Sequence, residues 1–222
     1  MNILKLTSTF VWFVIGVAIA QAFGTVAAAQ DAELYDPAPP PNAAFVRVVN
    51  ATAADLSISA QLAGINFGEL AYPGVSAYQV VQEGERVFQS GAKNQSLTIK
   101  AGNYYTIAVL GQGEAQQIVP IQDSVSDNPA KCGVLFYNLS DRPSASLRVP
   151  SRDVDVIAAV SPGEGKLREV NALDIDLAVV AGEQPVHSFD TVQLKRRTHL
   201  SFMLTGAGDD LQVLMAENTT VQ

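Results

Sequence analysis

Cysteine and histidine are nearly absent from this chain of 222 residues, which has one cysteine, Cys132, and two histidines, His187 and His199. A lone cysteine cannot form an internal disulfide, so apolar burial must hold the fold together. Cys132 itself is expected to be a small buried hydrophobe at the start of a strand. Zinc sites need three or four ligands at recognisable spacing. The sequence therefore predicts no bound metal and no cofactor.

Positive charge is also scarce. The chain has 14 Lys and Arg against 22 Asp and Glu, a formal net charge of −8. Binding to a phosphate backbone demands a basic face, so this balance argues against nucleic acid as a partner.

The first 29 residues are typical of a signal peptide. Lys5 gives a basic start, residues 10–20 are apolar, and Ala27-Ala28-Ala29 supplies the small residues that precede a cleavage site. We therefore expect a mature chain that begins at or close to Gln30 and is exported. A retained membrane anchor is the alternative, because the apolar stretch approaches the roughly 20 residues that a spanning helix needs. After cleavage, no stable membrane span is expected.

Apolar and polar residues alternate with a period of two through most of the mature sequence. Residues 56–62 and 173–179 show this alternation most clearly, and it is typical of half-buried strands. No convincing stretch has helical spacing. Further strands are predicted over 45–50, 77–82, 96–100, 104–110, 134–138, 154–160, 199–204 and 211–215. Short strands separated by Gly, Pro, Asn and Asp predict an all-β protein of β-sandwiches, immunoglobulin-like or similar to carbohydrate-binding modules.

The chain also resembles itself. Residues 45–52 match 133–140 as an apolar strand that ends in Asn, an apolar-sized residue and a hydroxyl. Residues 100–113 match 195–208, and both segments end in Gly-x-Gly, a turn that accepts positive φ. The offsets of 88 and 95 residues predict a duplicated unit. The alternative is a chance likeness between two β-rich segments.

A duplicated unit fixes the expected domain organisation. Residues 30–43 form a Pro-rich lead-in that cannot enter a central strand. Two tandem β-sandwich domains are then expected over residues 44–125 and 130–222. The chain-breaking run Asp127-Asn128-Pro129 divides them.

A serine-type active site finds little support in the sequence. There is no Gly-x-Ser-x-Gly motif, and the run nearest to it, residues 74–78, lacks the second Gly and precedes a strand. His199 alternates with apolar residues and is expected to point outward from a strand, whereas His187 is expected in a polar connection after Pro185. We therefore expect no enzyme. A cryptic serine-type acyltransferase, with its nucleophile hidden among the many serines, is the less favoured alternative.

Basic residues gather in the second half, which holds nine of the thirteen that follow the leader. Lys195-Arg196-Arg197 is the tightest group, and Arg148 and Arg152 are candidates to lie near it. Such a patch suits a polyanionic polysaccharide or an acidic partner protein. In a strand at most two of the three consecutive side chains would share a face, unless they form a turn. The alternative is a solvated strand edge protected by charge.

Five blocks after the leader resemble the alginate O-acetylation protein AlgF family, and the likeness covers essentially the whole mature chain. These blocks are residues 31–35, 45–51, 138–141, 168–171 with 177–178, and the turn Gly206-x-Gly208. The resemblance implies a periplasmic subunit of the machinery that acetylates alginate, a polyuronate. It also implies a protein that is required but lacks the serine-esterase-like site of its partners, and it carries over no site residue.

From this resemblance we expect a non-catalytic adaptor that bridges periplasmic acetyl-transfer proteins. Whether it also contacts the alginate polysaccharide is left open. A stand-alone carbohydrate-binding module is the alternative. Such modules read sugar rings with exposed aromatic side chains on one face, and only one of Tyr104 and Tyr105 can belong to such a platform, since consecutive strand residues face opposite sides.

Overall fold

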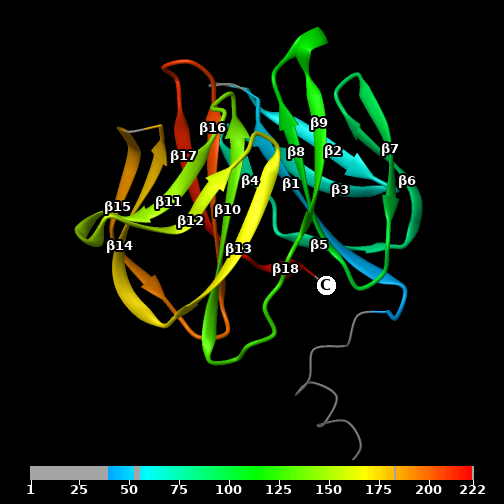
Figure 1. The fold of residues 1–222 in the computed structure, drawn as a ribbon. Coiled ribbons are helices and arrows are strands. Elements are labelled where there is room, and N and C mark those ends of the chain that lie inside the picture. The colour runs from blue at the N-terminus through cyan, green and yellow to red at the C-terminus, as the bar shows by residue number, and fades with distance from the viewer. Residues whose placement is uncertain (1–39, 53–55, 183, 222) are drawn as a thin grey trace, which may run out of the picture. The chain divides into compact units, whose positions relative to one another are not determined.

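Strands make up nearly all of the computed structural model (Figure 1), which describes residues 40–52, 56–182 and 184–221. This confirms the predicted all-β class. The expected signal peptide and most of the lead-in lie outside the described residues. Of the strands, the first half of the chain contains β1 (Ala43–Ala51), β2 (Ile58–Leu62), β3 (Ile65–Leu70), β4 (Gly74–Val75), β5 (Tyr78–Gln82), β6 (Gly84–Ser90), β7 (Lys93–Ile99), β8 (Tyr104–Leu110) and β9 (Gln117–Asp123).

The second half contains β10 (Lys131–Ser140), β11 (Ala145–Val149), β12 (Val154–Val160), β13 (Glu164–Asn171), β14 (Leu173–Ala181), β15 (Gln184–Leu194), β16 (His199–Gly206), β17 (Gln212–Glu217) and β18 (Thr220–Val221). Two single turns of 3₁₀ helix, η1 (Gly113–Ala115) and η2 (Pro150–Arg152), interrupt the strands. Within the described ranges, no helix is long and apolar enough to cross a membrane.

The strands form two β-sandwiches. In the first, the sheet β3-β2-β6-β7 packs on the sheet β18-β5-β1-β8-β9, with β4 also paired to β1. In the second, the sheet β12-β11-β14-β15 packs on the sheet β13-β10-β16-β17. Each sandwich buries its own apolar core, centred on Phe88 and Ile107 in the first and on Phe136 and Phe202 in the second. The predicted sandwich architecture is therefore correct.

A third apolar cluster joins the two sandwiches. It includes Val49 and Ala108 from the first sandwich and Leu135, Leu139 and Met203 from the second. The sheets that carry β1, β8, β10 and β16 therefore face each other, which gives four layers of sheet. Strands covered on both sides read as continuous apolar runs rather than alternating ones, and β10 is accordingly buried along almost its whole length.

Residues related by the sequence offsets of 88 and 95 occupy equivalent positions in the two sandwiches. The pair β1 and β8 is parallel with Phe45 opposite Tyr104, and the pair β10 and β16 is parallel with Gly133 opposite His199. In both pairs a fully buried asparagine, Asn50 or Asn138, donates from its side chain to two backbone carbonyls. Each asparagine also accepts from the backbone N–H and the hydroxyl of the residue two positions later.

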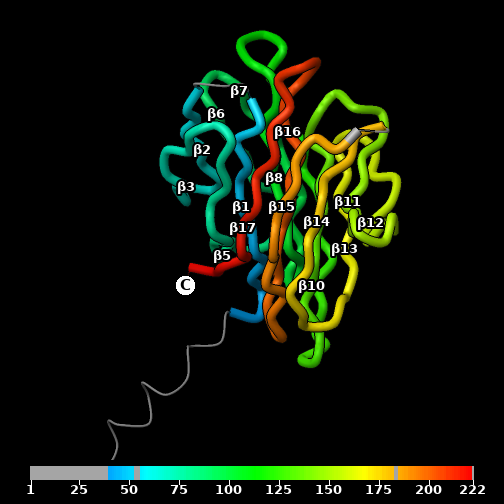
Figure 2. Tube along the Cα trace, turned by 90° about the vertical axis from the view of Figure 1, so that its left-hand side faces the viewer, coloured from blue at the N-terminus to red at the C-terminus, as the bar shows by residue number. Residues whose placement is uncertain are grey.

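The chain also crosses between the sandwiches at two points. Strand β18, the end of the described chain, pairs in parallel with β5 of the first sandwich, and Figure 2 shows it beside that strand. The connection that follows β9 lies on the second sandwich, where the Ser126 hydroxyl donates to Glu169 at 2.6 Å. Each sandwich is therefore covered in part by a segment that follows the other sandwich's last strand.

Candidate functional site: an exposed basic surface

The predicted group Lys195-Arg196-Arg197 forms a turn between β15 and β16, so the strand limit on shared faces does not apply. Arg197 has φ +62°, a left-handed conformation that costs a non-glycine residue about 1 kcal/mol and must be held by its surroundings. The turn is held by hydrogen bonds. The backbone N–H of Arg197 donates to the carbonyl of Lys131 at 2.9 Å, and the Thr198 hydroxyl donates to the carbonyl of Lys195 at 2.8 Å.

These bonds bring Lys131, which the sequence did not single out, to the same surface. We call Lys131, Lys195, Arg196 and Arg197 the basic tip. The last three are exposed and Lys131 is half-buried, with its ammonium group donating to the Asn171 side chain at 2.7 Å. Among the residues that the structure describes, no carboxylate lies within 4.0 Å of any of the four cationic groups. Their charges are therefore available to an external anion.

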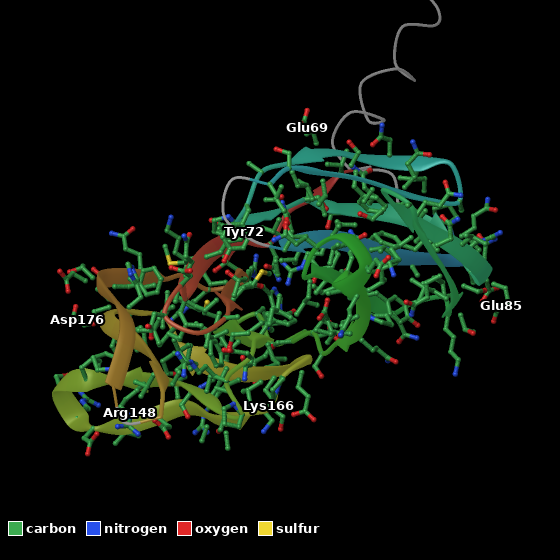
Figure 3. The ribbon with its side chains drawn as sticks, turned by 90° about the horizontal axis from the view of Figure 1, so that it is seen from above. Glu69, Tyr72, Glu85, Arg148, Lys166 and Asp176 are labelled. Carbon is green, nitrogen blue, oxygen red and sulfur yellow. The ribbon has the colours of Figure 1, made fainter. Side chains whose placement is uncertain are left out.

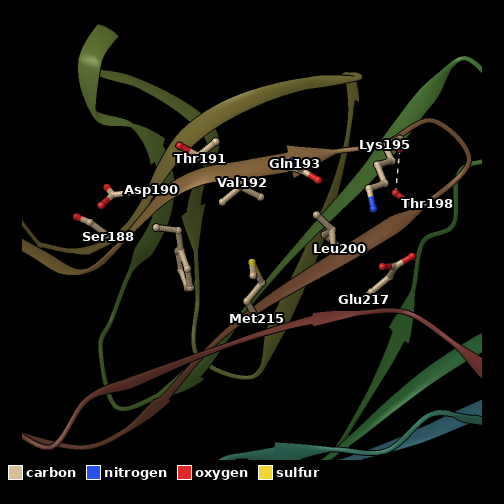
Figure 4. Close-up of a pocket in the computed structure, with 11 residues that line it drawn as sticks. Ser188, Asp190, Thr191, Val192, Gln193, Lys195, Thr198, Leu200, Met215 and Glu217 are labelled. Atoms are coloured by element: carbon tan, nitrogen blue, oxygen red, sulfur yellow. Dashed lines mark hydrogen bonds between the residues drawn. The ribbon is translucent and has the colours of Figure 1, made fainter.

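A cleft of about 410 Å³ opens beside the basic tip, between β15 and β17 (Figure 4). Val192, Leu200 and the half-exposed Met215 give it an apolar floor. Lys195 and Glu217 stand at one end, where Figure 4 also shows the bond from Thr198 to Lys195. Asp190 lines the cleft as well, so one cation faces two carboxylates in its lining. The cleft therefore suits a small apolar group, whereas an anion is expected on the basic tip beside it.

The structure gives Arg148 and Arg152 a different setting. The Arg148 guanidinium donates to Asp155 at 2.7 Å and to Asp153 at 3.0 Å, and the Asp155 bond raises the pKa of Arg148. Arg152, in η2, shares a hollow with Asp174 and other residues of β14. No ion pair or hydrogen bond joins either arginine to the basic tip in the part of the chain described. Arg148 is thus largely neutralised where it lies.

The two histidines differ from expectation. His187 is an exposed residue of β15 that packs edge-on against Phe189, with ring centroids 4.5 Å apart, rather than a residue of a connection. His199 is half-buried, because it lies over Gly133, where any Cβ would meet its ring. Its Nε2 accepts the backbone N–H of Ser126 at 3.2 Å, and desolvation lowers its pKa. Within the described ranges, no hydroxyl bonds to either ring.

Two sequence expectations about single side chains are confirmed. Cys132 is fully buried near the start of β10. Tyr105 is buried in the first core, whereas Tyr104 is half-buried and stacks on Phe45 with ring centroids 4.4 Å apart. The two tyrosines therefore do not form a shared platform for a sugar ring.

A buried polar cluster between the sandwiches was not predicted. Arg47, 1% exposed, donates to Thr106 on its own sandwich and to Tyr137, Ser201 and Asn218 on the other, at 2.8–2.9 Å. The Asp123 carboxylate accepts hydrogen bonds from the hydroxyls of Tyr78, Thr106 and Tyr137 at 2.6–2.8 Å. Burial raises the pKa of Tyr78 and Tyr137, so both stay protonated donors. The sequence signal was a single arginine within the apolar strand 45–49.

Fold and surface together define an all-β protein of two stacked β-sandwiches that presents an exposed cationic tip. The family model described as "Alginate O-acetyl transferase AlgF" matches residues 15–200. The chain belongs to the AlgF family, as the sequence resemblance predicted.

Curated relatives named "Alginate biosynthesis protein AlgF" match most of the chain. The protein from Pseudomonas fluorescens is 30% identical over 184 residues, which cover 82% of each chain. The one from Azotobacter vinelandii is 28% identical over 199 residues, which cover 89% of each chain. Among solved structures, the C-terminal domain of AlgF from P. aeruginosa is 27% identical with a TM-score of 0.37, and the match covers 40% of this chain and 99% of that one.

Proposed function

We propose that this chain is a non-catalytic periplasmic adaptor of alginate O-acetylation, and that its basic tip holds the anionic polymer or an acidic face of a partner. The observation that carries the proposal is the basic tip itself. Four cations gather at one end of a protein whose formal net charge is −8, and none of them pairs with a carboxylate among the residues that the structure describes. Arginine and lysine placed in this way attract carboxylates at short range and raise the rate of encounter.

The family supports alginate as the polymer, because the names of the relatives link them to alginate biosynthesis. Alginate has a carboxylate on every sugar, so several cations in a row match its repeating charge. The lateral cleft adds a place where an apolar substituent such as an acetyl methyl group can pack against Met215 and Val192 while the carboxylates of the polymer meet the basic tip beside it. Charge would thus contribute most to ligand binding at this site, and apolar contact would contribute less.

Two observations support an adaptor rather than an enzyme. The half-buried His199 uses its Nε2 as an acceptor for a backbone N–H, so this nitrogen is not free to take a proton from a serine. The polar cluster around Arg47 buries its charged groups, Arg47 and Asp123, inside the molecule. The acetyl-transfer proteins of the pathway are therefore the proposed partners, and they would supply the chemistry.

The lateral cleft beside the basic tip also favours a second candidate, a carbohydrate-binding module that acts alone. The two candidates differ in what a tip mutation does. A binding module that acts alone would lose polymer binding in the tip variant. It would have no association with acetyl-transfer proteins that the mutation could change.

The test is the double variant Arg196→Glu/Arg197→Glu. We expect alginate oligomers to bind roughly tenfold more weakly at physiological salt, equivalent to about 1.4 kcal/mol, and acetylation in cells to fall. Thermal stability should stay close to that of the parent protein, because both side chains are exposed. Lys93→Glu/Lys100→Glu makes the same charge change on the first sandwich and should leave binding unaltered. Unchanged oligomer binding and acetylation in the tip variant would refute the proposal.

A further inference from the structure

A second groove opens between the two sandwiches, at the end of the molecule opposite the basic tip. The basic tip lies where β10 and β16 begin, and this groove lies where they end, at Ser140 and Gly206. Eight strand residues separate the two ends, about 25 Å. The groove has a volume of about 670 Å³. Seen from above, Tyr72 lies where the two sandwiches meet (Figure 3), and its hydroxyl is 3.1 Å from that of Thr205.

The groove has two matching walls, because most of the residues that line it are equivalent under the two sequence offsets. Three of these equivalent pairs are Thr52 with Ser140, Gly111 with Gly206, and Gln117 with Gln212. The glycines shape both walls in the same way. Each has positive φ, and a Cβ on either would come within 2.7 Å of a backbone carbonyl in its own loop. A groove of this symmetry suits a linear ligand that runs between the walls.

Each wall contains the first residue of an edge strand. Gln117 begins β9 and Gln212 begins β17, and these two strands are the edges of the two facing sheets. An edge strand leaves outward N–H and C=O groups unpaired, and an extended peptide can add to such a row. Both glutamine side chains are exposed and, within the described ranges, neither has a hydrogen-bond partner. A side-chain amide has both a donor and an acceptor, which match the two groups of a peptide unit.

The charge of this groove is opposite to that of the basic tip. Asp141 and Asp210 line it, and Asp209 is their exposed neighbour. Arg142 offsets one of these charges, since its Nε is 3.8 Å from Asp141 and its Nη2 donates to the carbonyl of Gly208. The balance stays negative, so a polyuronate would be repelled and a cationic chain attracted.

We propose that this groove, which we call the inter-sandwich groove, receives an extended cationic segment of a partner protein. The proposal rests on the adaptor function and deepens it. The basic tip would take the polyanion at one end of the molecule, and the inter-sandwich groove would take a basic peptide strand at the other. Matched walls, the starts of two edge strands and negative charge carry the proposal together.

The test uses the ¹⁵N-labelled mature protein and a capped heptapeptide of alternating lysine and threonine. We expect backbone resonances of Gly111, Gly206, Gln117 and Gln212 to shift on titration. The variant Asp141→Asn/Asp210→Asn should weaken binding about two- to thirtyfold, because it removes two exposed charge contacts with the cationic peptide. Asparagine at position 141 retains an oxygen acceptor for the N–H of Gly208. The matched control Asp174→Asn/Asp176→Asn changes two exposed carboxylates on β14 and should bind as the parent does.

Three outcomes would overturn the proposal: no shifts at the groove, equal binding of an alternating glutamate and threonine peptide, or no effect of the groove variant. Titration of alginate oligomers into the same sample separates this proposal from the adaptor function. If oligomers shift Lys195 and Arg197 while the cationic peptide shifts nothing, the basic tip stands and the inter-sandwich groove fails. If the peptide shifts the groove resonances while the oligomers shift nothing at the basic tip, the proposed polymer site is refuted and the inter-sandwich groove stands.

Discussion

The Arg47 guanidinium donates to the Tyr137 hydroxyl across the boundary between the two sandwiches, at 2.9 Å, and the Tyr137 hydroxyl donates in turn to Asp123 at 2.7 Å. The Tyr137 hydroxyl of the second sandwich thus links two buried charged groups of the first sandwich, the Arg47 guanidinium and the Asp123 carboxylate. The offset of 95 residues makes Asp123 equivalent to Asn218, which accepts from Arg47 on the other side.

The first prediction concerns this cluster. Arg47→Leu introduces the residue type found at the equivalent position, Leu135, but leaves the Asp123 charge buried without its cation. Removing one partner of a buried charge pair costs about 3–5 kcal/mol. We expect a loss of that size in the free energy of unfolding, measured in urea.

The control is the double variant Arg47→Leu/Asp123→Asn, which removes both charges. It should recover a substantial part of the loss, because two neutral buried groups replace one unpaired charge. A double variant that is destabilised by the full sum of the two single changes would show that Arg47 and Asp123 do not interact.

The sequence predicted two strands with their exact bounds. The ranges 104–110 and 154–160 agree with β8 and β12 at both ends. Of the strands that the structure describes, the prediction missed β3, β4, β6, β9, β11, β13, β15 and β18. Among these, β3, β6, β9 and β13 carry mainly polar or exposed residues, so their alternation was weak. Strands β3, β9 and β13 are also edges of their sheets. Edge strands are paired on one side only and need few apolar residues, which explains why composition alone does not identify them.

The candidate site was predictable only where it is local. Lys195, Arg196 and Arg197 are neighbours in sequence, and their exposure followed from charge. Lys131 joins them only through the bond from the Arg197 N–H to its carbonyl, a contact between residues 66 positions apart. Arg148 pairs with Asp153 and Asp155, which are close to it in sequence.

The second prediction compares the two buried asparagines. Asn50→Ala and Asn138→Ala each remove two donated and two accepted hydrogen bonds and leave two backbone carbonyls without their partner. We expect each variant to lose roughly 1–3 kcal/mol of unfolding free energy. The losses should be alike, because the bonds are alike. A large loss at one position with none at the other, in matched urea titrations, would contradict structural equivalence of the two units.

The third prediction concerns pH. Desolvation lowers the pKa of His199 below its ordinary 6.5, so the unfolded chain takes up a proton at a higher pH than the folded one does. The stability contributed by the neutral ring is present above 6.5 and is lost as pH falls through the folded pKa. Protonation also removes the Nε2 acceptor for the Ser126 N–H.

We therefore expect the wild-type protein to lose more unfolding free energy between pH 7 and pH 5 than His199→Gln does. Glutamine does not titrate and can still offer an oxygen acceptor to Ser126. His187→Gln is the matched control, because His187 is exposed, and its pH dependence should follow the wild type. Identical pH profiles for wild type and His199→Gln would rule out this role of His199.

The last prediction concerns the proposed division into domains over 44–125 and 130–222. The core around Phe88 and Ile107 is drawn entirely from the first half, and the core around Phe136 and Phe202 entirely from the second. We therefore expect fragments 40–129 and 130–222 each to unfold cooperatively and to show strand-like circular dichroism.

Each fragment should nevertheless be less stable than the full chain. Separation exposes the apolar cluster that includes Val49, Leu135 and Met203, and it leaves Arg47 without its partners on the second sandwich. An exposed face of this kind favours association, so mixing the two fragments should give a one-to-one complex in sedimentation, with a higher melting temperature than either alone. Fragments that both lack a cooperative transition would show instead that the facing sheets fold only together, as one unit.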